Sequence, residues 1–294
     1  MTRTLVVINP VSGPKRSRPA DACSAQARSI LGRHGFEVEV AITSAPGDAR
    51  RLTEHARASG ARMVVAWGGD GTINEVASAL AFSDVPLAIV PGGSGNGLAR
   101  DLGLPLDAAR ALEVAATGRR RTIDAGRLDE SLFFNVAGIG LDAEIARRLA
   151  STQARRGLTG YMQATLRELP GYRARAYAVE ANEARTEYRA LFIALANSRQ
   201  YGSGAQIAPA ARLDDGKLDL VVVEDQPTWQ ILTQLPAFFR GTLAPRPGLR
   251  MTQVTSALIQ AEGPFGFHVD GEPRTCAHLL RVQAHPGALR VVVP

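Results

Sequence analysis

Cysteine, lysine and aromatic residues are scarce in this chain of 294 residues. The only two cysteines, Cys23 and Cys276, lie far apart, which argues against a disulfide framework and against a cysteine-rich zinc site. No segment approaches the ~20 consecutive apolar residues that span a bilayer. The N-terminus runs directly into an apolar, strand-like segment without the pattern of a signal peptide, so we expect a cytoplasmic protein.

The chain carries a formal net charge of +6, and of its basic residues only Lys15 and Lys217 are lysines. A basic surface attracts anionic partners such as nucleic acid, acidic lipid headgroups or nucleotide phosphates. Aromatic residues make up 5% of the chain and do not interleave with the arginine clusters at 119–121, 147–148 and 155–156. This pattern argues against a stacking platform for single-stranded nucleic acid, so we expect no nucleic-acid partner.

Residues 1–124 alternate between strand and helix patterns. Short apolar runs and helical spacings follow one another, which predicts a parallel sheet covered by helices. The predicted strands are 5–9, 37–42, 63–67 and 86–90, and the predicted helices are 20–34, 47–59, 72–80 and one from 98 onward.

Residues 125–294 are richer in strand patterns, which predicts a second domain of antiparallel strands. The predicted strands are 132–136, 176–180, 188–196, 218–223, 253–261, 266–269, 279–284 and 288–293. Two helical stretches, 158–169 and 228–240, interrupt them. Their apolar faces could line a pocket, rest on anionic lipid or pack on the strands, and the sequence leaves these choices open.

The strongest chemical signal is the segment WGGDGTINE (67–75), in which a strand enters a glycine-rich turn that opens a helix. Glycines allow close approach of the backbone to a phosphate, and free N–H groups at a helix start favour negative charge. Asp70 could hold Mg²⁺ or accept a proton. A tight turn with a structural aspartate remains the alternative.

Two further loops follow predicted strands. The segment PGGSGNGLAR (91–100) repeats the order of strand, glycines and helix, and INPVSG (8–13) ends a strand in a polar turn. The carboxyl ends of parallel strands meet at one sheet edge, so we expect the glycine-rich turns to lie there together. Asn96 stands where a serine-hydrolase elbow needs glycine, which argues against that chemistry.

Taken in order, these three motifs resemble the catalytic domain of the diacylglycerol kinase superfamily. Bacterial lipid kinases and sphingosine kinases share the signature, and NAD kinases are distant relatives. The similarity continues over nearly the whole chain, through FNVAGIGLD (134–142), ALANS (194–198), LDDGKLD (213–219) and VDGEP (269–273).

The resemblance implies an α/β N-terminal nucleotide-binding domain with a parallel sheet, residues 1–124, and a C-terminal antiparallel β-sandwich domain, residues 125–294, with the active cleft between them. It also implies that ATP and Mg²⁺ are used to phosphorylate a lipid hydroxyl. The residues that it assigns to ATP are Asn9, Lys15, Thr43, Gly68, Gly69, Asp70, Gly71, Thr72, Asn74, Glu75, Gly93, Ser94, Asn96 and Arg100.

The resemblance further implies a Mg²⁺ site made by Asp215 with the carbonyls of Arg212 and Lys217, and such oxygen ligation suits Mg²⁺. Asp270 and Glu272 match catalytic carboxylates. Two carboxylates two residues apart on a strand would share a face. We expect Glu272 to act as the base, because a lipid alcohol needs a proton acceptor within reach, while Asp70 and Asp270 organise metal and phosphates.

Diacylglycerol is the expected acceptor, with a sphingoid long-chain base as the alternative. Many bacterial diacylglycerol kinases carry an acidic residue where this chain has Gly97, and the Ser94-Gly-Asn96 form is more similar to sphingosine kinases. Peripheral contact with the inner face of the membrane and a homodimer are further expectations. The remaining alternatives are an NAD kinase, a catalytically silent nucleotide- or lipid-binding regulator and a basic nucleic-acid binder.

Overall fold

The computed structural model describes residues 2–13, 19–151, 165, 167–169, 171–202 and 204–294. The chain forms two compact units, and it passes from the first to the second and later returns to the first. Unit 1 comprises Met1–Ile123 and Gly287–Pro294, and unit 2 comprises Asp124–Pro286. Within the described residues, no helix is both long and apolar enough to cross a bilayer.

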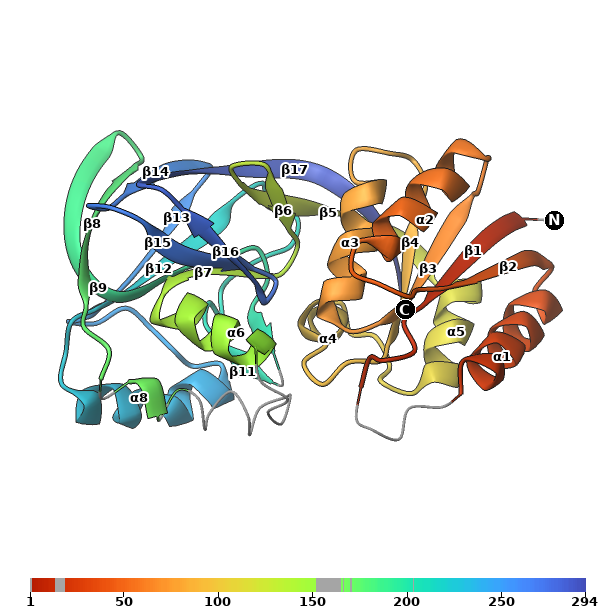
Figure 1. The fold of residues 1–294 in the computed structure, drawn as a ribbon, viewed down its shortest axis with the longest axis horizontal. Coiled ribbons are helices and arrows are strands. Elements are labelled where there is room, and N and C mark those ends of the chain that lie inside the picture. Colours follow the sequence, from red (N-terminus) through yellow and green to blue (C-terminus); the bar gives the residue numbers. More distant parts are fainter. Residues whose placement is uncertain (1, 14–18, 152–164, 166, 170, 203) are drawn as a thin grey trace. The chain divides into compact units, whose positions relative to one another are not determined.

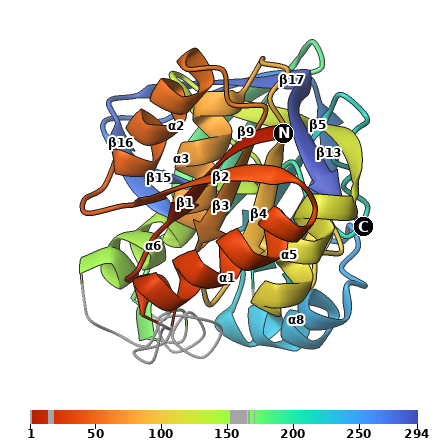
Figure 2. The same cartoon turned by 90° about the vertical axis from the view of Figure 1, so that its right-hand side faces the viewer.

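Unit 1 is a parallel sheet with helices on both faces (Figures 1 and 2). Its strand order is β17-β4-β3-β1-β2, and β17 joins the edge through the pairing of Val291 with Leu87. The strands are β1 (Thr2–Ile8), β2 (Phe36–Ile42), β3 (Met63–Gly68), β4 (Leu87–Pro91) and the C-terminal part of β17 (Leu279–Val293). The helices are α1 (Ala20–Arg33), α2 (Asp48–Ala58), α3 (Asp70–Leu80), α4 (Gly97–Asp101) and α5 (Ala108–Thr117).

The continuous apolar runs of β3 and β4 are explained by burial on both faces, as is usual in parallel sheets. Helices α1 and α5 pack on one face through small and aliphatic side chains, among them Ala27, Leu31 and Leu112. Helices α2 and α3 pack together on the other face.

Unit 2 is dominated by antiparallel strands with one large apolar core and two smaller apolar clusters beside it. Its strands are β5 (Arg119–Leu128, which begins in unit 1), β6 (Ser131–Phe133), β7 (Val136–Gly140), β8 (Arg175–Ala181), β9 (Ala184–Ala196), β10 (Gln200–Gly202), β11 (Ala205–Gln206), β12 (Leu218–Glu224), β13 (Leu249–Val254), β14 (Ser256–Gln260), β15 (Phe265–Val269), β16 (Glu272–Cys276) and the first part of β17. Helix α6 (Leu141–Ser151) packs on β7, β15 and β16, and α8 is Thr228–Arg240. The predicted fold class, a parallel α/β domain followed by antiparallel strands, is confirmed.

Several predicted elements have different bounds. The predicted strand 132–136 is divided into β6 and β7, because the N–H of Asn135 donates to Asp270 and its carbonyl accepts from Asn197. The predicted strand 253–261 is also two strands, because β13 pairs with β12 whereas β14 pairs with β8 and β17. Most of the predicted helix 158–169 lies outside the described residues.

Candidate functional site

The loops after the parallel strands of unit 1 are tied together at the carboxyl edge of the sheet. The N–H of Asn9 donates to the carbonyl of Trp67 at 2.9 Å, and the N–H of Gly92 donates to that of Gly68 at 2.7 Å. Thr43, which follows β2, donates its N–H to Ile8 at 2.9 Å. The expectation that the two glycine-rich turns share one edge is confirmed.

Asp70 joins the two glycine-rich loops through both of its carboxylate oxygens. Oδ2 accepts the N–H of Asn96 and Oδ1 accepts the N–H of Gly97, each at 2.9 Å. Burial raises the pKa of the Asp70 carboxyl above its ordinary value, although these two N–H groups and the charge of Arg100 oppose that change. In this structure Asp70 therefore fixes the position of one loop against the other.

Asn96 holds the second loop in its shape. Its backbone lies in the left-handed region with φ 52°, which asparagine tolerates better than most residues. Its side-chain Oδ1 accepts the N–H of Gly93 at 2.9 Å, and its Nδ2 donates to the carbonyl of Gly93 at 2.8 Å. The side chain is thus bonded within its own loop.

The glycines at this edge are required by close backbone approach. A Cβ atom on Gly93 would lie 2.7 Å from the Cα of Gly69, and one on Gly95 would lie 2.7 Å from Oδ2 of Asp70. One on Gly13, whose φ is 100°, would lie 2.5 Å from the carbonyl oxygen of Gly92. The three loops therefore pack closely against one another, and their half-buried glycine backbone suits the approach of a phosphate.

Asn9 links the first loop to helix α3. Its Nδ2 donates to the hydroxyl of Thr72 at 2.8 Å, and its Oδ1 accepts the N–H of Val11 at 3.1 Å. The hydroxyl of Ser12 donates to the carbonyl of Asn9 at 2.8 Å, a contact that the sequence analysis did not anticipate although Ser12 lies in the quoted motif. Arg100 Nε donates to the carbonyl of Gly95 at 3.1 Å, so this cation lies over the glycine loop.

Two residues assigned to ATP bond to other parts of unit 1, and a third lies outside the described residues. The carboxylate of Glu75 accepts the N–H groups of Gly47 at 2.9 Å and Arg50 at 3.3 Å, at the start of helix α2. Asn74 Oδ1 accepts from the hydroxyl of Ser78 at 3.4 Å. Lys15 lies outside the described residues.

In unit 2, Asp270 lies in the turn of the β15–β16 hairpin. Asp270 and Gly271 have φ 48° and 91°, as in the two-residue Asp-Gly hairpin turn. The Asp270 carboxylate accepts the N–H groups of Phe134, Asn135 and Val136 at 3.0–3.1 Å. The argument that Asp270 and Glu272 share one face of a strand was therefore wrong, because only Glu272 lies on a strand; Glu272 itself is exposed at the start of β16.

A buried pair that the sequence analysis missed lies below this hairpin. Asp142 and His268 are 2% and 4% exposed, and Asp142 Oδ2 lies 2.6 Å from His268 Nε2. Nδ1 of the same ring accepts the N–H of Gly271 at 3.3 Å. Each residue lies in or beside a quoted motif, but nothing in the sequence joins positions 126 residues apart.

A second polar network lies where strand β7 begins and strand β9 ends. Asn197 Nδ2 donates to the carbonyls of Asp124 at 3.0 Å and Phe134 at 2.9 Å, and the hydroxyl of Ser198 donates to Asn135 Oδ1. Among the described residues, Asn197 Oδ1 and Gln200 Oε1 are buried without a hydrogen-bond partner. Such atoms are expected to meet water or a ligand.

The predicted metal site lies in the loop before β12. Asp215 accepts the N–H of Lys217 at 3.1 Å and the side chain of Gln253 at 3.2 Å. Burial and the neighbouring Asp215 raise the pKa of Asp219 to about 6. Two neighbouring carboxylates with carbonyl oxygens suit the oxygen chemistry of Mg²⁺, although within the described residues no three acidic, His or Cys side chains converge on one point.

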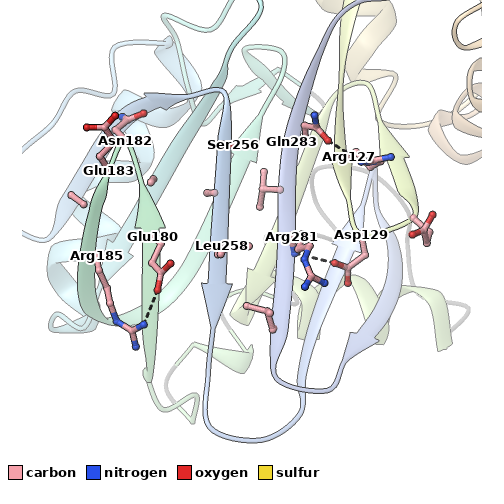
Figure 3. Close-up of a pocket in the computed structure, with 16 residues that line it drawn as sticks. Arg127, Asp129, Glu180, Asn182, Glu183, Arg185, Ser256, Leu258, Arg281 and Gln283 are labelled. Atoms are coloured by element: carbon pink, nitrogen blue, oxygen red, sulfur yellow. Dashed lines mark hydrogen bonds and ion pairs between the residues drawn. The ribbon is translucent and has the colours of Figure 1, made fainter.

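A hollow on the sheet of unit 2 lies between β5, β8, β14 and β17 (Figure 3). It is less suited to a binding or catalytic site than the glycine loops. Its charged side chains bond to one another or to neighbouring amides: Arg185 with Glu180 at 2.7 Å, Arg127 with Gln283 at 2.8 Å, and Asp129 with the N–H of Arg281 at 2.9 Å. We therefore do not assign a site there.

The chain is similar to known kinases over nearly its whole length. Residues 3–128 match the diacylglycerol kinase catalytic domain, and residues 135–293 match the YegS C-terminal NAD kinase beta sandwich-like domain. A Pseudomonas aeruginosa protein named "Probable lipid kinase YegS-like" is 34% identical over 88% of this chain and 86% of its own length. A Klebsiella pneumoniae protein of the same name is 31% identical over 92% and 90%.

Solved structures share the fold. Two crystal structures from Bacillus anthracis each cover 100% of this chain and 97% of their own, with TM-scores of 0.85 at 22% identity and 0.76 at 20% identity. The second is described as a diacylglycerol kinase. With the domain matches, they confirm the predicted β-sandwich character of the C-terminal part. The chain therefore belongs to the YegS-like family of lipid kinases, with a diacylglycerol kinase catalytic domain followed by a β-sandwich-like domain.

Proposed function

We propose that this kinase transfers the γ-phosphoryl group of ATP to the free hydroxyl of diacylglycerol and so forms phosphatidic acid. Family membership supports a kinase that uses ATP. The observation that carries the proposal within the structure is the pair of glycine loops joined by Asp70, which brings the starts of helices α3 and α4 and the side chain of Arg100 together at one sheet edge. Amides and a guanidinium in this arrangement suit phosphate oxygens.

In this proposal, Asp70 maintains the phosphate-binding surface. Asp270 maintains the hairpin that carries Glu272, because its carboxylate is already bonded to three amides. Glu272 would accept the proton of the lipid hydroxyl as its oxygen bonds to the γ-phosphorus and ADP leaves. Mg²⁺, if held by Asp215 and the carbonyls of Arg212 and Lys217, would supply structural order to that loop.

The acceptor remains a choice between diacylglycerol and a sphingoid base. Two observations weaken the argument from the second loop, since the side chain of Asn96 bonds within the loop and Gly97 contributes its N–H to Asp70. Any residue except proline supplies that N–H, so the missing acidic side chain at position 97 carries little information about the lipid. We therefore keep diacylglycerol as the acceptor.

We further propose that helix α8 contacts the membrane that contains the lipid. Its inner face packs on the unit 2 core through Ile231 and Phe238. Its outer face presents Trp229, which is 64% exposed, and Leu232, which is 38% exposed, at helical spacing. A tryptophan beside an apolar side chain, on a helix whose last turn carries the cation Arg240, is suited to the bilayer interface.

The acceptor is tested by supplying Mg-ATP labelled in the γ-phosphate to lipids presented one at a time in mixed micelles. The panel holds diacylglycerol, monoacylglycerol, sphingosine, dihydrosphingosine and ceramide, with NAD as a control. The proposal predicts labelled phosphatidic acid from diacylglycerol and no labelled product from NAD. Label in a sphingoid base alone would replace the proposed acceptor, and no labelled lipid at all would contradict the lipid kinase function.

A further inference from the structure

A second hollow in unit 2 is rich in arginine. It has a volume of about 390 Å³ and lies among helix α6, the segment that enters β8, and the β15–β16 hairpin. We call it the arginine hollow, and define it by four of its lining arginines, Arg147, Arg173, Arg175 and Arg274, with Tyr172 and Tyr177. This volume exceeds that of a phosphate group and is within the range of small-molecule sites.

The arginine hollow has an excess of positive charge. Its four arginines face one acidic residue, Glu144, which pairs with Arg147 at 3.0 Å. Arg175 is held by the carbonyls of Glu262 at 2.7 Å and Pro264 at 2.8 Å, so carbonyls rather than a carboxylate receive its N–H groups.

Two of the arginines lack a counter-charge among the described residues. Arg173 and Arg274 are exposed and have no ion-pair partner in the part of the chain that the structure describes. Like charges around one concave surface repel each other, so binding of an anion there is favourable. The planar guanidinium fork matches the oxygen spacing of phosphate.

Tyr177 provides an independent sign of a ligand. Its side chain is 1% exposed and packs edge-on against Phe265, with ring centroids 5.7 Å apart. Its hydroxyl is buried and meets no partner in hydrogen-bond geometry among the described residues, although the Tyr172 phenol is near enough to act on its pKa as a hydrogen-bonding neighbour. Burial raises the pKa of Tyr177 and of its electrostatic neighbour Tyr172, so both phenols stay neutral and keep a proton to donate. A buried donor in the lining of a hollow that also carries two arginines without an ion pair among the described residues is what an anionic ligand would complete.

We propose that the arginine hollow binds a phosphate group, with Arg173 and Arg274 as the charged contacts and the Tyr177 hydroxyl as a neutral donor. None of its residues belongs to the glycine loops of unit 1, so the proposal rests on other residues than the proposed phosphate surface and does not depend on the acceptor. The ligand class is a phosphomonoester, which could be a free metabolite or the headgroup of an anionic lipid.

The test is equilibrium binding to the full chain at low and high salt. One arm uses inorganic phosphate and glycerol 3-phosphate, and the other uses phosphatidylcholine vesicles with and without phosphatidic acid. We expect saturable binding in at least one arm, and that arm identifies the source. Arg173→Ala or Arg274→Ala should weaken it at least tenfold, whereas Arg185→Ala, which removes an arginine from the other hollow, should not. Binding that no variant changes belongs to another site and overturns the proposal, as does an absence of binding in both arms.

The Tyr177→Phe variant tests whether the Tyr177 hydroxyl donates to the ligand or only has a structural role. Because the hydroxyl has no partner in hydrogen-bond geometry among the described residues, its removal should leave the urea midpoint unchanged or higher while it weakens phosphate binding several-fold. A lowered midpoint with unchanged phosphate binding would show that this hydroxyl has a structural role and would remove it from the site. Kinase activity on the acceptor is measured in parallel, so that failure of the proposed acceptor is distinguished from failure of this site.

Discussion

Asp70 lies at the start of helix α3 and accepts the backbone N–H of Asn96, at the start of helix α4, at 2.9 Å. Its other oxygen accepts the next N–H, that of Gly97, at the same distance. Two helix starts that follow adjacent parallel strands are thereby joined by one carboxylate. The relation explains why an acidic side chain is needed there, since a carboxylate supplies two acceptors at once.

Asp70→Asn should lower kinase activity on the order of 100-fold, because the amide can accept only one of the two N–H groups and leaves the other unpaired. The unfolding free energy should also fall by about 1–3 kcal/mol. Steady-state kinetics and urea unfolding measure the two effects. The matched control is Asp84→Asn, which removes an exposed carboxylate from the same unit. Full activity with an unchanged Km for ATP would contradict this role.

Glu75→Ala should reduce stability while it changes the Km for ATP little. The carboxylate bonds to N–H groups at the start of α2, and loss of such a cap lowers the unfolding free energy by about 1 kcal/mol. Thermal unfolding and ATP titration separate the effects. The control is Glu54→Ala, because Glu54 forms only an exposed ion pair with Arg50 on the same helix. A large rise in the Km for ATP at unchanged stability would instead restore the assignment of Glu75 to the nucleotide.

The Asp142–His268 pair should make stability depend on pH. Burial disfavours the charged ring, but Asp142 and Asp270 raise the pKa of His268 above its ordinary value of 6.5. A basic group whose pKa is raised in the folded state stabilises it below the unfolded pKa and loses that effect as the pH rises through the folded pKa. The unfolding free energy should therefore fall as the pH rises above 6.5, and Asp142→Asn should flatten this dependence.

Urea unfolding at a series of pH values measures this dependence. The neutral ring accepts the N–H of Gly271 at Nδ1, and this contact opposes the expected fall. An unfolding free energy that rises with pH in the wild type would show that the neutral ring is the more stabilising form.

Trp229 and Leu232 should be required for binding to anionic vesicles. The chain has two tryptophans, of which Trp67 is buried, so Trp67→Phe leaves Trp229 as the single fluorescent reporter. Its emission should shift to shorter wavelength when phosphatidylglycerol vesicles are added. Leu232→Ser should weaken the vesicle binding severalfold, whereas Thr233→Ser, on the same exposed side, should not. An emission that vesicles do not change would remove α8 from the proposed membrane contact.

The parallel sheet could be predicted because its central strands are short continuous apolar runs in the sequence. Strand β3 is an uninterrupted apolar run that ends at glycines, and its predicted and observed bounds differ by one residue. Strand β5 was missed because its first residues are the exposed arginines Arg119 and Arg120, whereas only its second half is buried. The return of Gly287–Pro294 to unit 1 depends on contacts with β4 that no local pattern reveals.

The site was predictable in its motifs and less so in its contacts. Glycine spacing indicated where the loops lie, since the glycines avoid clashes that any Cβ would cause. The bonds of Glu75 to α2 and of Asp142 to His268 join distant positions, so the sequence could not assign these side chains. Asp270 differs from expectation because its φ of 48° places it in a turn and not on a strand.

The most direct test of the central claim is competition between two acceptors in one micelle. Diacylglycerol and sphingosine are supplied at equal mole fraction with Mg-ATP, and the phosphorylated products are quantified by mass spectrometry for the wild type and for Glu272→Gln. We predict that phosphatidic acid is the main product of the wild type and that Glu272→Gln forms far less of it. Sphingosine phosphate as the main product, or equal phosphatidic acid from both proteins, would contradict the proposed acceptor or the proposed base respectively.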